Sequence, residues 1–261
     1  MSITGLSPQR EQQWQERQSL RIARQYELTL AREIRRAMRQ LARHSKSPGE
    51  QAEIIDEHGQ NIKRIIVKNW RQAWSVFGER ILNATQKSMG GMETKQGEEN
   101  DLFQLYLQQF IAQYGSQKVT QITGTTKKQA MEIINDAVAE GAREGLGQAA
   151  LGKLIRERMN PTSDALSTRR GRLIARTETH NAQATANHNA AKASGVPMVK
   201  EWVASRGERT RDWHSDADEQ TVPIDQPFIV DGEEMQHPGD PSARARNVIN
   251  CRCVVAYSRK R

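Results

Sequence analysis

The stretch LRIARQYELTLAREIRRAMRQL, residues 20–41, decides how the first part of the chain folds. Apolar side chains recur in it at steps of three or four residues, which places them along one face of an α-helix. They are Leu20, Ala23, Tyr26, Leu30, Ile34, Ala37 and Leu41. Arginine and glutamine dominate the opposite face. The pattern predicts a helix over about residues 9–43, which is either an arm lying on a partner or one half of a helical pair.

Helical periodicity continues beyond this segment. We expect further helices over about residues 49–88, 102–115 and 125–143, a short one ending near residue 159, and a last one from residue 164 or 167 to 194. Glycine and proline mark the expected breaks, among them Gly115 and the pair Asn160–Pro161. Trp70 and Trp74 lie in the apolar stripe of the second helix and are predicted to be core. Gly195 is the expected stop of the last helix.

The character of the sequence changes after Pro197. Runs rich in β-branched and aromatic residues predict strands at residues 201–204, 222–230 and 253–257. The fold class is therefore mainly α, with long N-terminal helices followed by a small C-terminal α+β module. We divide the chain into a helical N-terminal region, residues 1–120, and a C-terminal domain, residues 121–261.

Charge is distributed in blocks along the chain, whose net charge is +8. Residues 1–49 and residues 242–261 each carry +6, residues 153–176 carry +5, and residues 212–241 carry −9. Such blocks indicate contact with a polyanion through some surfaces, although solvated helix faces beside one acidic loop explain them equally well. Aromatic residues make up only 5% of the chain, which disfavours a stacking platform for single-stranded nucleic acid.

Hydropathy disfavours a membrane protein. The longest uninterrupted apolar stretch is about the length of residues 253–257, far shorter than a bilayer-spanning helix requires. Glu16 and Arg17 interrupt any apolar run near the start, so a signal peptide is not expected. We expect a soluble protein, cytoplasmic where it is made, that does not contact a membrane.

Six short motifs follow one another in the last ninety or so residues. They are IARTET (174–179), GV (195–196), KEW (200–202), RTRDWH (209–214), PGDP (238–241) and NCRC (250–253). Their order and spacing resemble the C-terminal domain of the phage Mu F-like and SPP1-type minor head proteins, over roughly residues 125–258. Glu208 replaces the aspartate usual before the Arg-Thr-Arg segment. The motif residues that we single out are Arg176, Glu178, Trp202, His214, Pro238, Gly239, Asp240, Asn250 and Arg252.

The resemblance implies a minor capsid (head morphogenesis) protein of a tailed bacteriophage, incorporated into the procapsid near the portal and without catalytic activity. The resemblance implies that the protein resides inside the virion head, and in the host cytoplasm during assembly. The implied partners are the portal protein and the inner capsid, which we expect residues 1–120 to contact. The basic blocks agree with a position beside packaged double-stranded DNA. We expect electrostatic DNA contact from the N-terminal arm and from the basic tail, at Arg244, Arg246, Arg259, Lys260 and Arg261.

Cys251 and Cys253 raise the question of a metal. On a strand, a spacing of two places both sulfurs on one face, where they can share an ion. His214 and His237 would complete a Cys₂His₂ structural zinc site, with Asp216 as an oxygen substitute. The alternative is a pair of reduced, buried thiols that act as small hydrophobes.

The remaining motif residues have structural interpretations. Arg176 and Glu178 face different directions on a helix, so each is expected to bond to the C-terminal module. His180 and His188 are expected to be solvated. Residues 238–241 predict a type II turn with a positive φ at the glycine.

One alternative function of another class remains. Asp212, His214 and Asp216 lie within five positions and could hold the ion of a metal-dependent nuclease or phosphoesterase associated with phage DNA.

Overall fold

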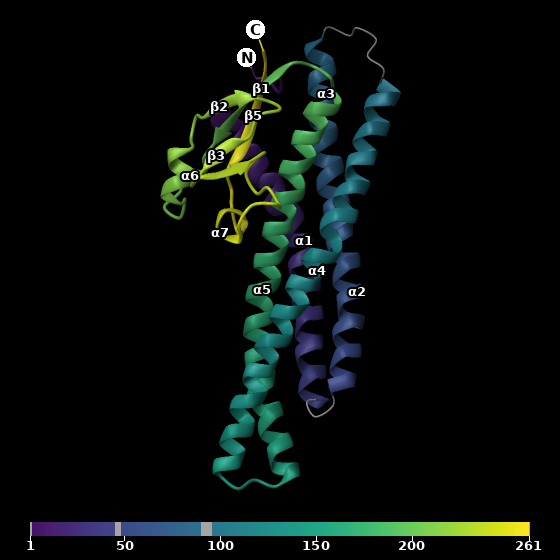
Figure 1. The fold of residues 1–261 in the computed structure, drawn as a ribbon, viewed down its shortest axis with the longest axis vertical. Helices are drawn as coiled ribbons and strands as arrows, with labels where there is room; N and C mark the ends of the chain where they lie inside the picture. The colour runs from purple at the N-terminus through teal and green to yellow at the C-terminus, as the bar shows by residue number, and fades with distance from the viewer. Residues whose placement is uncertain (1, 45–47, 90–95, 261) are drawn as a thin grey trace. The chain divides into compact units, whose positions relative to one another are not determined.

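The computed structural model describes residues 2–44, 48–89 and 96–260. Long helices come first and a small region with short strands follows, so the predicted fold class is confirmed (Figure 1). The helices of the first part are α1 (Pro8–Arg43), α2 (Pro48–Ala73), the π-helical segment η1 (Trp74–Gly78), α3 (Glu79–Ser88), α4 (Gln96–Arg143) and α5 (Gln148–Ala193). The expected stop at Gly195 is also confirmed, with a φ of +64°.

Two predicted helix breaks are wrong. Gly115 lies inside α4, which joins the two helices expected at residues 102–115 and 125–143, and Pro161 lies inside α5. A glycine costs a helix only about 1 kcal/mol, and burial of apolar side chains outweighs it. Proline removes one backbone hydrogen bond, yet Met159 and Ser163 on either side of it are both buried. Packing therefore overrides the local signal.

The C-terminal module contains two antiparallel sheets and two short helices. Its elements are β1 (Met198–Val203), α6 (Asp212–Asp216), β2 (Thr221–Pro223), β3 (Phe228–Val230), β4 (Glu233–Met235), α7 (Ala245–Val248) and β5 (Val254–Arg259). The first sheet has the order β2-β1-β5, and β3 and β4 form a separate pair. The single strand predicted at residues 222–230 is wrong, because a turn at Pro223–Gln226 sends β2 and β3 to different sheets.

The chain forms two compact units, each built from discontinuous segments. The first unit comprises Met1–Ala23, Lys68–Ala112 and Arg176–Arg261, and the second comprises Arg24–Val67 and Gln113–Ala175. The boundary predicted between residues 120 and 121 falls inside α4. The division into an N-terminal region and a C-terminal domain remains a prediction.

The second unit is a helical assembly whose main core cluster is apolar. Its core comprises Ile34, Met38, Leu41, Ala42, Ala130, Ile134, Ala137, Ile155 and Met159. Gly171 of α5 lies so close to α1 that an added Cβ would come within 2.6 Å of the carbonyl oxygen of Glu27. The glycine allows the two helix backbones to approach.

The first unit joins the start of the chain to the C-terminal module. The backbone nitrogen of Ile3 donates to the carbonyl oxygen of Tyr257 in β5 (3.0 Å). Trp70 and Trp74 are both buried and pack against Phe110 at ring-centroid distances of 4.7 and 5.3 Å. Their predicted core role is confirmed.

Within the three described ranges, no helix combines the length and the apolar character needed to cross a bilayer.

Candidate functional site

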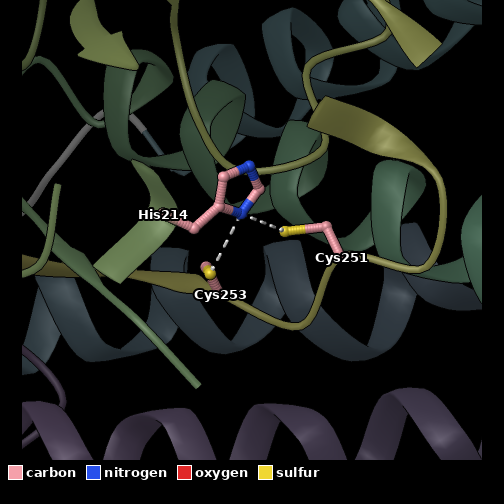
Figure 2. A group of neighbouring side chains, drawn as sticks. All are labelled: His214, Cys251 and Cys253. Atoms are coloured by element: carbon pink, nitrogen blue, oxygen red, sulfur yellow. Dashed lines mark hydrogen bonds between the residues drawn. The ribbon is translucent and has the colours of Figure 1, made fainter. Parts of the chain in front are cut away.

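His214, Cys251 and Cys253 converge in the first unit, as Figure 2 shows. The Nδ1 atom of His214 lies 3.7 Å from Sγ of Cys251 and 3.5 Å from Sγ of Cys253. The three candidate ligand atoms all lie within 4.8 Å of one another, and all three side chains are buried. The structure therefore brings together three of the four residues that the sequence proposed as metal ligands.

Local backbone geometry creates this convergence. His214 lies on the single turn of α6, and its backbone nitrogen donates to the carbonyl oxygen of Arg211 (2.9 Å). The two cysteines lie just before β5 and not on it, so their predicted placement on a strand is wrong. Asn250 adopts a φ of +57°, a conformation that asparagine tolerates, and its backbone nitrogen donates to Oγ1 of Thr177 (3.1 Å). This turn directs both sulfurs toward the histidine.

The surroundings of the cluster are apolar on one side. Trp202 in β1 is fully buried, and its ring contacts the His214 ring edge-on at a centroid distance of 5.5 Å. The two thiols are coupled, because a hydrogen bond between them lowers the pKa of Cys251 and raises that of Cys253. Burial adds to the increase at Cys253.

A cavity of about 200 Å³ adjoins the cluster. All three candidate ligand residues line it, together with residues of the segment 205–211. That segment contributes two hydroxyls (Ser205 and Thr210), two guanidinium groups (Arg209 and Arg211) and the carboxylate of Glu208 to the wall. A small polar or anionic molecule can therefore reach this face of the cluster.

His237 is placed elsewhere. Its buried ring lies 5.7 Å from the ring of His188, and its Nδ1 hydrogen-bonds to the carbonyl oxygen of Pro238 (3.1 Å). Asp212 and Asp216 are exposed. Within the described residues, neither the second histidine nor an aspartate joins the group formed by the two sulfurs and His214.

His180 and His188 are buried, so the prediction that they are solvated is wrong. The stretch of α5 that holds them is covered on nearly every side, which a spacing of eight residues cannot reveal. Burial lowers the pKa of His180 to about 4 and also lowers those of His188 and His237. The three rings are therefore neutral at pH 7.

Residues 237–240 form the predicted turn. The backbone nitrogen of Asp240 donates to the carbonyl oxygen of His237 (3.1 Å), and Gly239 has a φ of +72°. An added Cβ at Gly239 would lie 2.6 Å from Nδ1 of His180, so only glycine fits against α5. Although burial raises the pKa of Asp240, nearby His237 and hydrogen bonds from Ser242 and the backbone of Gln236 lower it overall.

Arg176 and Glu178 lie in α5 on the side of the C-terminal module. Arg176 lines a small cavity that Asn250, Cys251 and Arg252 also line, and Glu178 is buried. Arg252 contacts Glu16 of α1 at 3.4 Å. That each of the two α5 residues fixes the module remains a prediction.

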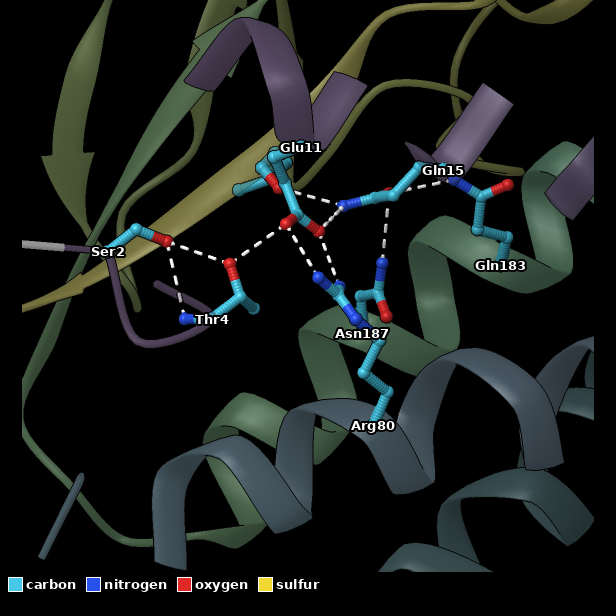
Figure 3. Close-up of polar contacts among 8 residues, drawn as sticks. Ser2, Thr4, Glu11, Gln15, Arg80, Gln183 and Asn187 are labelled. Carbon is cyan, nitrogen blue, oxygen red and sulfur yellow. Dashed lines mark hydrogen bonds and ion pairs between the residues drawn. The ribbon is translucent and has the colours of Figure 1, made fainter. Parts of the chain in front are cut away.

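A buried polar network, shown in Figure 3, was not foreseen from the sequence. Glu11 of α1 is 1% exposed and accepts two hydrogen bonds from the guanidinium of Arg80 (2.6 and 2.8 Å). Thr4 and Gln15 donate to the same carboxylate (2.8 and 2.7 Å). Although burial raises the pKa of Glu11, Arg80 and the other donors lower it below its usual value.

Gln15 extends this network to the C-terminal module. Its side-chain nitrogen donates to the carbonyl oxygen of Val255 in β5 (3.3 Å), and its oxygen accepts from Gln183 and Asn187 of α5 (2.7 and 3.1 Å). The sequence indicates this network only through spacing. Positions 11, 15 and 19 extend the apolar face of α1 toward the start of the helix, but polar residues occupy them.

The arginines predicted to contact DNA have partners in several cases. Arg244 lies 3.9 Å from Glu233, Arg246 pairs with Asp231, and Arg259 donates to the carbonyl oxygen of Ser88 (3.1 Å). Lys260 is exposed, and Arg261 lies outside the described residues. The acidic segment therefore partly neutralises the basic tail.

The fold and site describe a mainly helical protein with a small cysteine- and histidine-containing module. Residues 132–256 match the family model described as "Phage Mu protein F like protein". This part of the chain is thus a Mu F-like region, and the resemblance drawn from its motifs is confirmed. The family suggests a phage head-morphogenesis protein.

Two curated proteins are similar to parts of the chain. An NAD(+)–arginine ADP-ribosyltransferase of Enterococcus faecalis, EFV, is 28% identical over 129 residues, which is 48% of this chain and 25% of that protein. The uncharacterized protein YqbB of Bacillus subtilis is 32% identical over 91 residues, 33% of this chain and 30% of that protein. The chain therefore spans less than a third of either relative. No solved structure matches it.

Proposed function

We propose that this protein is a minor capsid protein of a tailed bacteriophage that enters the procapsid near the portal and acts in head morphogenesis without catalysis. The observation that carries the proposal is the match of residues 132–256 to the Mu F-like family. A structural role is supported by the motif residues Gly239, Asp240 and Asn250, which form turns and hydrogen bonds within the first unit. The virion head is the proposed location, and the portal and inner capsid are the proposed partners.

The composition of assembling heads tests this role. In a phage that carries this gene, the protein is expected in purified procapsids before DNA enters, and its removal is expected to lower the yield of infectious particles. Mass spectrometry of procapsids and filled heads gives the first result, and a plaque assay with complementation gives the second. Absence of the protein from both particles would contradict the proposal.

We further propose that the protein contacts DNA through one face of α1. Arg10, Arg17 and Arg21 are exposed and spaced by seven and four residues, which places them on one side of the helix. Arg244 and Arg246 of the tail are less available, because acidic neighbours already pair with them. The contact is electrostatic and independent of sequence.

Duplex binding at several salt concentrations tests the DNA contact. Replacing Arg10, Arg17 and Arg21 by glutamine is expected to weaken binding and to reduce the salt slope by about 3, since each phosphate contact contributes about 0.9. The matched control replaces Arg244 and Arg246 by glutamine and is expected to change the slope by less than 1. An unchanged slope in the α1 variant would exclude this face.

The nuclease or phosphoesterase hypothesis finds less support. Its two carboxylates, on Asp212 and Asp216, are exposed, while His214 is buried and faces two sulfurs. The activity named for the Enterococcus relative belongs to a protein of which this chain covers only 25%. DNA cleavage that disappears in the His214→Ala variant would revive the hypothesis.

A further inference from the structure

We propose that His214, Cys251 and Cys253 bind one zinc ion through three protein ligands, and that the fourth coordination position faces the adjoining cavity. The inference goes beyond head morphogenesis and does not depend on it. It rests on the distances among the three ligand atoms, on their burial, on their chemistry and on the cavity.

The distances fit a shared zinc ion. With Zn–S near 2.3 Å and Zn–N near 2.05 Å, a tetrahedral site separates sulfur from nitrogen by about 3.6 Å. The two separations between His214 Nδ1 and the cysteine sulfurs are 3.5 and 3.7 Å. One nitrogen therefore stands at the edge length of a zinc tetrahedron from both sulfurs at once.

The donor types select a soft ion. Thiolate sulfur with imidazole nitrogen is the donor set that zinc prefers, whereas calcium and magnesium require oxygen. Two thiolates also neutralise the double positive charge of the zinc ion, so the ion and both thiolates can be buried together without a net charge. Without a metal, Nδ1 of His214 can accept a hydrogen bond from only one of the two thiols, and the other thiol has the neighbouring sulfur as its partner.

Three protein ligands leave one position open. His237 and Asp216, the other ligands expected from the sequence, are not members of the group among the described residues. The cavity of about 200 Å³ reaches all three ligand residues, so its contents can approach the ion. Arg209 and Arg211 in its wall favour water or a small anion as the fourth ligand.

The site would also join separate parts of the module. His214 lies on α6, and the cysteines lie 37 and 39 positions later, just before β5. A metal that joins these segments restrains a long loop, which is how structural zinc stabilises small folds. The proposed site therefore combines a structural role with an accessible ion.

Metal content of the purified full chain tests the ligand set. After reconstitution with zinc and removal of excess metal, we expect one zinc per chain, and a loss of more than about 100-fold in affinity in Cys251→Ser and Cys253→Ser. His214→Cys is expected to retain the ion, because a thiolate replaces the imidazole. Asp216→Asn is the matched control on an exposed carboxylate and is expected to bind normally. Less than one-tenth of an equivalent in the folded wild type would overturn the proposal.

Spectroscopy tests the number of ligands without relying on the folding of any variant. Zinc X-ray absorption of the wild type should show two sulfur and two nitrogen or oxygen neighbours, with one imidazole. Two imidazoles would restore His237 as a ligand and overturn the open position. Cobalt-loaded protein should change its visible spectrum when azide is added, whereas a spectrum indifferent to azide would show a closed site.

Discussion

In the second compact unit the main buried cluster is apolar, with Ile34, Met38 and Ile134 among its members. In the first unit, many of the buried groups are polar or ionisable, including Glu11, Lys200 and His237. An apolar core loses stability in proportion to the volume removed. A buried polar network loses more stability when one partner is removed, because the other polar or charged group then stays buried without a hydrogen bond or counter-charge. The two units should therefore respond differently to single substitutions.

The largest effect is expected from Arg80→Met. This change leaves the Glu11 carboxylate buried without its cation, and we expect the free energy of unfolding to fall by about 3–5 kcal/mol. Urea denaturation followed by circular dichroism measures it. The double variant Glu11→Gln with Arg80→Met should recover part of the loss. A loss below about 1 kcal/mol in Arg80→Met would show that the pair is not needed.

Ile34→Ala probes the apolar unit. Ile34 is fully buried, so we expect a loss of about 3 kcal/mol from lost burial and the remaining cavity. Leu28→Ala, on the same helix but 70% exposed, is the control and should stay within about 0.5 kcal/mol of the wild type. Equal effects of the two substitutions in thermal or urea unfolding would contradict the assigned core.

Gly239→Ala tests close packing in the polar unit. The new Cβ would meet His180 at 2.6 Å at a positive φ, and we expect a loss of about 2 kcal/mol. Gly232→Ala is a matched control, because its φ of +68° is similar but nothing lies within 4 Å of the added atom. Its expected loss, from backbone strain alone, is about 1 kcal/mol. A control as destabilised as Gly239→Ala would remove the packing argument.

Acid should weaken the polar unit by a smaller, gradual effect. Burial lowers the pKa of His188, and His237, Lys200 and Lys192 face it and lower it further. In the unfolded chain His188 binds a proton near pH 6.5, whereas in the folded chain it stays neutral at that pH. The free energy of unfolding therefore falls as the pH decreases from 7 to 5. His188→Gln should reduce the slope of unfolding free energy against pH. An unchanged slope would contradict the neutral, buried ring.

The sequence predicted the parts of the structure that depend on repeating apolar positions. The helix over residues 8–43, the core tryptophans and the stop at Gly195 all follow from periodicity or from a glycine with positive φ. It failed where packing overrides a local signal, as at Gly115 and Pro161. No local pattern indicates how deeply a surrounding fold buries a helix.

The candidate site was predictable to a similar degree. Cysteine and histidine are scarce in this chain, so the sequence identified Cys251, Cys253 and His214 as possible ligands by residue type alone. It could not separate His214 from His237, since loop conformation decides which ring reaches the sulfurs. Glu11 was missed because an acidic residue in the first turn of a helix is usually solvated.

An asymmetric cryo-microscopy reconstruction of heads that contain a labelled copy of this chain tests the proposed function most directly. The account predicts density for the label inside the head at the single portal vertex, in procapsids and in filled particles alike. Label distributed evenly over the capsid shell, or found only outside the head, would contradict it.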